Sequence, residues 1–166
     1  MDTEPQWYAF YVQARHEKKV EQRLIQKNIV TFLPLIKVRK KWSDRYKMVK
    51  EPLIRGYVFC KIRLQNRLDV LETPGTINIV RIGEKYPPIQ DNEIRSLEIL
   101  VNGPNPITQE HAFMTGEQVT IQRGPFKGAH GVVIREKNRS RLTVGLEAIN
   151  ASFSVEIDSI DLAPVN

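Results

Sequence analysis

The chain has 166 residues, with 25 Lys or Arg against 19 Asp or Glu, and therefore a formal net charge of +6. Hydrophobic residues make up 41% of it, enough to build a core, which excludes wholesale disorder. No apolar run approaches the ~20 residues of a membrane-spanning helix, and residues 1–5 lack the basic start and apolar stretch of a signal peptide. We expect a soluble, cytoplasmic protein with no membrane partner.

The positive charge is concentrated in one segment of the first half. Residues 1–105 hold 19 basic and 12 acidic side chains, whereas residues 106–166 hold 6 and 7. Within the first half, residues 37–50 contain seven basic residues against the single acidic Asp44. These 14 residues therefore carry the same net charge as the whole chain, which indicates a local function for the charge.

Hydrophobic periodicity predicts strands and helices in the first hundred residues. A continuous aromatic and β-branched run at 7–12 predicts a buried strand, and Val20 and Leu24, spaced i, i+4, predict a helix over 15–28. The same signals and the capping residues predict further strands at 29–36, 53–64 and 76–82 and helices at 66–72 and 91–103. Helices mixed with non-adjacent strands predict an α+β sandwich.

A break in periodicity divides the chain into two domains. Residues 102–112 combine a helix-stopping glycine with two prolines and show no clear pattern. We therefore expect domains at 1–101 and 113–166, joined by this linker. Period-two alternation between turn residues predicts a small all-β barrel in the second domain, with strands at 118–123, 132–136, 141–146 and 152–157.

No group of residues predicts catalysis. His16, His111 and His130 lie in distant segments, without a pair at metal-ligand spacing. Cys60, the single cysteine, cannot form an internal disulfide and lies in an apolar run, where a buried small hydrophobe is expected. The glycine-rich residues 124–128 lack the Gly-Lys-Ser/Thr ending of a phosphate-binding loop. We expect a protein that is not an enzyme and that holds no metal or cofactor.

Aromatic residues are interleaved with the cations of the basic segment. Cations beside planar rings suit a phosphate backbone with unpaired bases, through counterion release and stacking. The alternative is that Trp42 packs the segment onto the sheet. The residues predicted to contact nucleic acid are Lys37, Arg39, Lys40, Lys41, Trp42, Arg45, Tyr46 and Lys47.

The run at 52–59 carries more apolar surface than a thin α+β domain readily covers. A central strand buried on both faces is one explanation, and it is the one we prefer for Val58. For Ile54 and Tyr57, an exposed hydrophobic patch that docks on a partner helix is an equal alternative.

Short motifs run through nearly the whole chain in a fixed order. In the first half they are Trp7-Tyr8, Phe32-Leu33-Pro34, Arg55-Gly56-Tyr57-Val58-Phe59, Pro74-Gly75 and Pro88-Ile89. In the second half they are Gly116-Glu117-Gln118-Val119, Gly124-Pro125-Phe126-Lys127-Gly128, Gly131-Val132-Val133 and Arg141-Leu142-Thr143-Val144. Together they resemble the NusG family of transcription elongation factors, with its NGN domain followed by its KOW domain.

This resemblance implies a fold and a function. The fold would be an NGN-type α/β sandwich with an antiparallel sheet, followed by an SH3-like KOW barrel. The NGN domain would bind the clamp helices of the largest subunit of RNA polymerase and suppress pausing or termination, and the protein would act as a monomer. The implied polymerase-binding residues are Trp7, Tyr8, Phe10, Ile54 and Tyr57.

The resemblance also assigns the remaining surfaces. The basic segment falls where the family carries a variable hairpin, close to upstream or non-template DNA and within reach of nascent RNA. The KOW domain would recruit a second partner, such as the termination factor Rho, a ribosomal protein or RNA. Its implied partner-binding residues are Phe126, Lys127, Ile149 and Asn150.

Departures from the housekeeping pattern favour a specialised paralogue. Residues 54–57 read Ile-Arg-Gly-Tyr where the housekeeping factor has Phe-Pro-Gly-Tyr, and Ile149 replaces a partner-binding phenylalanine. We expect an antiterminator of selected operons; the alternatives are the housekeeping factor itself and an RNA-binding or ribosome-associated KOW protein. The β-branched strands of the second domain predict a permanent barrel rather than one that refolds into helices.

Overall fold

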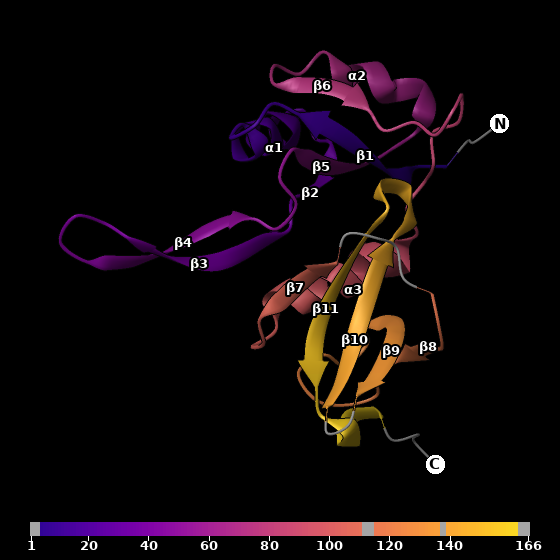
Figure 1. Ribbon diagram of the computed structural model, residues 1–166. Coiled ribbons are helices and arrows are strands. Elements are labelled where there is room, and N and C mark those ends of the chain that lie inside the picture. The colour runs from indigo at the N-terminus through magenta and orange to yellow at the C-terminus, as the bar shows by residue number, and fades with distance from the viewer. Residues whose placement is uncertain (1–3, 111–114, 137–138, 163–166) are drawn as a thin grey trace. The chain divides into compact units, whose positions relative to one another are not determined.

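The computed structural model describes residues 4–110, 115–136 and 139–162. The chain divides into two compact units, Met1–Pro88 (unit 1) and Ile89–Asn166 (unit 2), which Figure 1 colours from indigo to magenta and from rose to yellow. His111 and the predicted junction at 111–114 lie outside the described residues.

Unit 1 is a four-stranded antiparallel sheet with helices on one face and a separate two-stranded hairpin. The sheet has the strand order β2-β5-β1-β6, and β3 pairs only with β4. The elements, in chain order, are β1 (Gln6–Val12), α1 (Glu17–Gln26), β2 (Val30–Phe32), β3 (Leu35–Lys41), β4 (Tyr46–Pro52), β5 (Tyr57–Ile62), a 3-10 turn (Leu64–Asn66), α2 (Arg67–Leu71) and β6 (Thr76–Ile79).

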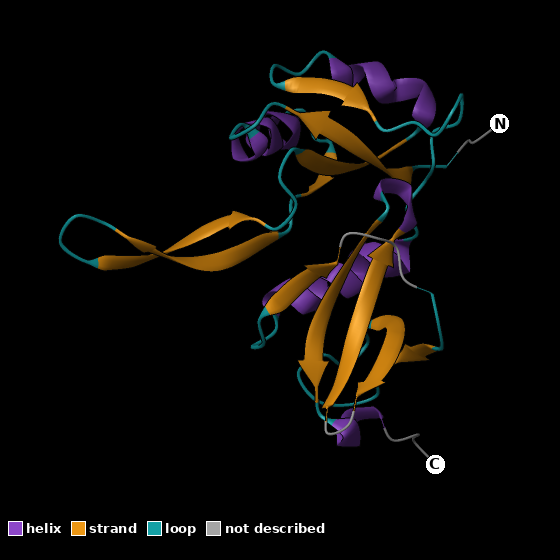
Figure 2. Cartoon of the chain, in the orientation of Figure 1, coloured by secondary structure: helices purple, strands orange, loops and turns teal. Residues whose placement is uncertain are grey.

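The core of unit 1 lies between this sheet and the helices α1 and α2. Side chains alternate along a strand, so Tyr8, Phe10 and Val12 of β1 all point to the same face. There they join a buried cluster with Val20 and Leu24 of α1, whose i, i+4 spacing forms one helix face. Figure 2 shows both helices on this side of the sheet.

The basic segment forms the β3–β4 hairpin. Pro34 separates β2 from β3, since a proline cannot donate a hydrogen bond to a sheet partner. The backbone carbonyl of Pro34 accepts a hydrogen bond from the N–H of Leu53 at 2.9 Å, which closes the base of the hairpin. Figure 2 shows the two strands reaching out from the rest of unit 1.

Unit 2 is a five-stranded antiparallel sheet with one long helix. The strand order is β7-β11-β10-β9-β8, and apolar pairs such as Leu142 with Val155 and Val144 with Phe153 lie directly opposite in its core. The elements are α3 (Asp91–Asn102), β7 (Ile107–Glu110), β8 (Gln118–Thr120), β9 (His130–Glu136), β10 (Arg139–Leu146), a 3-10 turn (Glu147–Ile149), β11 (Ala151–Ile157) and a last 3-10 turn (Ser159–Leu162).

Helix α3 packs against β9 and β10 of this sheet. The buried Ser96 hydroxyl accepts a hydrogen bond from the backbone N–H of His130 at 2.8 Å. At the end of the helix, Gly103 lies so close to the ring of Phe126 that a Cβ there would come within 2.2 Å of it. The helix is therefore integrated into unit 2.

The fold class agrees with the prediction, and three boundaries differ from it. A mixed α/β unit with an antiparallel sheet is followed by antiparallel strands, as expected. However, the predicted first domain included α3, whereas the compact units divide between Pro88 and Ile89. The predicted linker contains β7, which pairs with β11. Residues 53–56 form a turn before β5 instead of starting the strand, and Gly56 in that turn has a positive φ of 82°.

Candidate interaction surfaces

The second face of the unit 1 sheet carries a group of aromatic side chains. The register places Tyr11 opposite Tyr57, and it places Phe32 opposite Phe59. The rings of Tyr11 and Tyr57 lie 5.1 Å apart, and Trp7 meets Phe32 edge-on at 6.4 Å. Tyr11 is 39% exposed, and Trp7, Phe32 and Tyr57 are half-buried. We call Trp7, Tyr11, Phe32 and Tyr57, together with Phe59, which is fully buried, the aromatic face.

Partial burial changes the pKa of one tyrosine on the aromatic face. Desolvation raises the pKa of the Tyr57 hydroxyl above its usual range, and the neighbouring Tyr11 raises that pKa further. The Tyr57 hydroxyl therefore keeps its proton at physiological pH. A half-buried aromatic surface suits contact with an apolar partner.

Three of the predicted polymerase-binding residues lie elsewhere. Tyr8 and Phe10 alternate with Trp7 along β1, so they point into the helix-covered core and are buried. Ile54 is 4% exposed and lies in the turn before β5. We therefore remove Tyr8, Phe10 and Ile54 from the candidate surface. Trp7 and Tyr57 remain on it, and Tyr11 and Phe32 join it.

All the residues predicted to contact nucleic acid lie on the β3–β4 hairpin or its turn. The Arg39 guanidinium stands 4.0 Å from the centre of the Tyr46 ring, and the Lys47 ammonium stands 5.0 Å from that of Trp42. Trp42 is 49% exposed, so its ring is not packed down onto the sheet as the alternative required. Met48 is also exposed here, although no sequence pattern predicted it as a site residue.

A hydrogen bond joins the base of the hairpin to α1, and an ion pair lies within the hairpin. The Lys18 ammonium of α1 donates a hydrogen bond to the backbone carbonyl of Lys50. Glu51 forms an ion pair with Lys40. The hydrogen bond from Lys40 and the charges of Lys40, Arg55 and Lys18 lower the pKa of the Glu51 carboxyl, which therefore remains ionised.

The four residues predicted to bind a partner of the second domain differ in solvent exposure. Phe126 is 2% exposed and belongs to the core of unit 2, which corrects its assignment to the surface. Lys127 is exposed and Ile149 is half-buried. Asn150 is exposed at the end of a 3-10 turn, with a left-handed φ of 49°. Lys127 and Asn150 thus lie at the surface of unit 2, and Ile149 lies partly at it.

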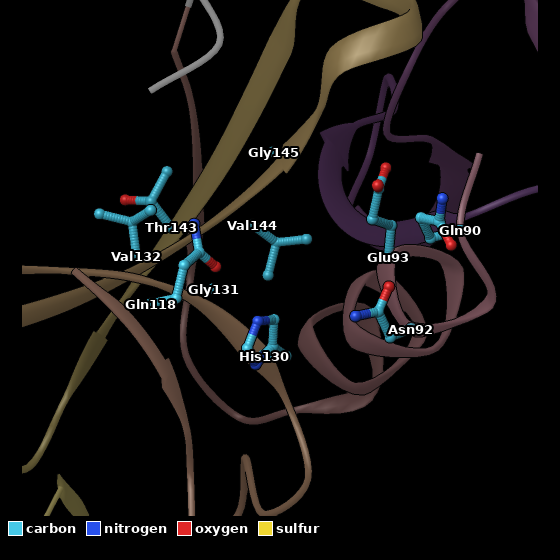
Figure 3. Close-up of a pocket in the computed structure, with 10 residues that line it drawn as sticks. All are labelled: Gln90, Asn92, Glu93, Gln118, His130, Gly131, Val132, Thr143, Val144 and Gly145. Carbon is cyan, nitrogen blue, oxygen red and sulfur yellow. The ribbon is translucent and has the colours of Figure 1, made fainter. Parts of the chain in front are cut away.

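A cavity of about 210 Å³ lies between α3 and the strands of unit 2. Figure 3 shows Gln90, Asn92 and Glu93 on its helix side, facing strand residues that include His130 and Val144. Burial raises the pKa of Glu93 to about 6; a backbone hydrogen bond at Gln90 opposes the rise, and the charge of Glu147 adds to it. Sequence reasoning missed this site, because it predicted α3 in the other domain.

Raising the pH from 4.5 to 7 is expected to destabilise unit 2 through Glu93. The folded-state pKa of Glu93 is about 6, above the ordinary 4.5, because burial disfavours the ionised carboxylate. The folded state is therefore more stable when this carboxyl is protonated than when it is ionised. That contribution is complete below pH 4.5 and is lost as the pH rises through 6. Because the side chain is partly exposed, we expect a loss of about 1 kcal/mol.

The measurement is thermal unfolding followed by circular dichroism between pH 4.5 and 7, for the intact protein and for Glu93→Gln. The variant lacks the titrating group, so its stability should decline less over this interval. Identical pH profiles of the two proteins would contradict the assignment.

The described residues contain no group of three or more His, Cys, Asp or Glu that could hold a metal ion. Cys60 is buried in the core of unit 1, and desolvation raises the pKa of its thiol to about 12, with a hydrogen bond from Thr31 opposing the rise. A thiol of this pKa is not a nucleophile at neutral pH. Within the described residues, no helix has both the length and the apolar character needed to cross a membrane.

Fold and surfaces together define a two-unit protein whose distinctive features are an aromatic sheet face and an extended basic hairpin. A family model described as "Transcription termination factor nusG" matches residues 5–98, more than half of the chain. The chain belongs to the NusG family, whose members are transcription factors.

A search of the solved structures matched this chain to two structures at low sequence identity. One, titled "Domain interaction in Thermotoga maritima NusG", is 21% identical, with a TM-score of 0.44 over 89% of this chain and 96% of that one. The other, titled "Crystal Structure of MjSpt4:Spt5 complex conformation A", is 18% identical, with a TM-score of 0.34 over 90% of this chain and 91% of that one. A search of the curated proteins found no match.

Proposed function

We propose that this protein is a transcription elongation factor that binds RNA polymerase through the aromatic face of unit 1. Family membership supports a role in transcription. The observation that carries the surface assignment is the Tyr11–Tyr57 pair, with Tyr11 exposed and Tyr57 half-buried, on the face away from α1 and α2. The polymerase partner would be a pair of apolar helices, the clamp helices of the largest subunit, onto which a flat aromatic surface can pack.

In the same proposal, the β3–β4 hairpin contacts upstream or non-template DNA that the polymerase already holds. The exposed cations of the hairpin and the Arg39–Tyr46 pair support this role. The factor catalyses no reaction. Its effect on pausing or termination comes from binding the processive state of the polymerase more tightly than the paused state, because a ligand shifts an equilibrium only through such a difference.

The second unit would recruit a further partner through Lys127, Ile149 and Asn150. An isoleucine at 149 in place of an aromatic residue favours a specialised antiterminator of selected operons over the housekeeping factor. A cytoplasmic location and action as a monomer follow from this function.

The test measures capture of core RNA polymerase by the intact protein and by a Tyr11→Asp, Tyr57→Asp variant. Two carboxylates in an apolar interface would have to lose their water without gaining partners, so we expect at least about tenfold weaker capture. The matched control is Ile25→Asp, Leu68→Asp, which changes two exposed apolar residues of α1 and α2. Failure of the intact protein to bind polymerase, or equal losses in both variants, would contradict the proposal.

A second candidate function is RNA binding without polymerase, as in a ribosome-associated protein. The basic hairpin favours it, since its cations suit any phosphate backbone. Salt-dependent binding of RNA by the intact protein, together with no capture of polymerase, would support this function over the first.

A further inference from the structure

The two faces of the β3–β4 hairpin differ in chemistry. Side chains alternate between the faces of a strand, and the register places Lys37 opposite Lys50 and Val38 opposite Val49. This sorts the hairpin into two sets. Beyond the half-buried Leu35–Pro52 pair at the base of the hairpin, one side consists of Lys37, Arg39, Lys41, Tyr46, Met48 and Lys50, which we call the cationic face. The apolar face consists of Ile36, Val38, Lys40, Lys47, Val49 and Glu51; Trp42, in the turn, is in contact with Lys47 of this face.

Burial follows the same division. Every residue of the cationic face is exposed. On the apolar face, Ile36, Val38, Val49 and Glu51 are half-buried, whereas Lys40 and Lys47, nearer the turn, are exposed. A two-stranded ribbon needs one packed side to hold its register, and the opposed Val38 and Val49 supply it. The cationic face is therefore free for another role.

The charges are also distributed unequally. The cationic face has four positive side chains and no acidic one, and Lys37 and Lys50 stand directly opposite each other. Like charges in that position destabilise a strand pair, so the arrangement does not serve the stability of the hairpin. The apolar face has an opposed pair as well, Lys40 and Lys47, but Glu51 forms an ion pair with Lys40.

The cationic face also offers a stacking surface. Arg39 lies over the Tyr46 ring at 4.0 Å, and the ring remains 56% exposed. Stacked guanidinium and phenol planes are the groups on which unpaired bases stack. Lys37, Arg39 and Lys41 follow at intervals of about 6.8 Å along β3, which gives a regular row of cations for a phosphate backbone.

We propose that the hairpin binds a single-stranded nucleic-acid segment on its cationic face alone, with Tyr46 and Arg39 as the stacking surface. This inference rests on the proposed function. It goes beyond that function, which does not distinguish among the eight residues predicted to contact nucleic acid. The apolar face holds the hairpin together, and Lys40, neutralised by Glu51, takes no part in binding.

The experiment compares two pairs of variants of the full chain, with a fluorescent 20-nucleotide oligo-dT as probe. Lys37→Gln, Lys50→Gln removes an opposed lysine pair from the cationic face. Lys40→Gln, Lys47→Gln removes an opposed lysine pair from the apolar face and lowers the net charge by the same amount. Loss of two phosphate contacts should weaken binding about 20-fold near 0.1 M salt and lower the log–log salt slope by about 1.4. The apolar-face variant should change affinity less than about threefold.

A second pair of variants separates stacking from charge. Tyr46→Ala on the cationic face should weaken oligo-dT binding about fivefold or more, and Trp42→Ala should leave it within about twofold. Both residues are exposed, so neither change should unfold the hairpin; unchanged circular dichroism checks this. Equal losses from the two faces, a larger loss from the apolar face, or tighter binding of a duplex than of oligo-dT would overturn the inference.

These outcomes are distinguishable from a failure of the proposed function. If the intact protein captures polymerase and binds oligo-dT but the faces are equivalent, only the face assignment is wrong. If the intact protein binds neither, the proposed function fails and takes this inference with it.

Discussion

Replacing Gly75 by alanine is expected to lower the free energy of unfolding of unit 1 by about 3 kcal/mol. Gly75 has a φ of 99°, a left-handed conformation that costs a residue with a Cβ about 1–2 kcal/mol. A Cβ at this position would also lie 2.6 Å from a methyl carbon of Val20, which is fully buried in the core of unit 1. Such overpacking costs about 1–3 kcal/mol more.

Gly83 provides a matched control within the same unit. Its φ of 63° imposes a similar backbone strain, but nothing lies within 4 Å of the position that its Cβ would take. Gly83→Ala should therefore cost only about 1 kcal/mol. The difference between the two variants isolates the contact with Val20, which fixes the turn before β6 against helix α1.

Urea unfolding followed by tryptophan fluorescence measures this difference directly. Both tryptophans of the chain, Trp7 and Trp42, lie in unit 1, so the signal reports on that unit. Equal midpoints for Gly75→Ala and Gly83→Ala would show that the turn can move away from α1 without cost, and that Val20 does not restrict it.

The sequence predicted the strand β1 and the alternation of its side chains. It did not predict which of the two faces is covered by helices and which is left for a partner. The run at 7–12 predicted β1 correctly. The motif resemblance then grouped Trp7, Tyr8 and Phe10 together, although neighbours on a strand point to opposite faces. Only the positions of α1 and α2 show that Tyr8 and Phe10 belong to the core and Trp7 to the other face.

The location and the charge of the hairpin could be predicted from the sequence. The pairing of its two strands and their register could not. The seven cations spread over residues 37–50 give no hydrophobic periodicity from which two paired strands could be recognised. The exact register, with Lys37 opposite Lys50, sorts the cations into two faces, and a shift of one residue would exchange those faces. Sequence reasoning therefore treated eight residues as one site.

Helix α3 illustrates a different limit. Its amphipathic pattern predicted the helix within one residue of its observed end at Asn102. Amphipathicity states that one face is buried, but not against which sheet. The contacts that settle this, between Ser96 and His130 and between Gly103 and Phe126, join positions more than 20 residues apart, and a single sequence carries no signal for them.

Phe126→Ala is expected to destabilise unit 2 by about 3–5 kcal/mol, the usual cost of truncating a fully buried phenylalanine. The ring is 2% exposed and lies against Gly103 at the end of α3, so its removal leaves a cavity where the helix meets the turn at 124–128. The family resemblance instead implied a role in binding a partner. A surface residue with that role would change the free energy of unfolding by less than about 0.5 kcal/mol.

Lys127→Ala is the matched control, because Lys127 is the exposed neighbour in the same turn. Amide hydrogen exchange distinguishes the two roles, since the central strands of a sheet exchange only through large opening reactions. In Phe126→Ala, the amides of β10 and β11 should exchange at least about 100-fold faster, and those of β1 and β5 should not change. In Lys127→Ala, all four strands should match the intact protein. Unchanged exchange in Phe126→Ala would mean that the ring does not support unit 2, and it would return Phe126 to the candidate partner surface.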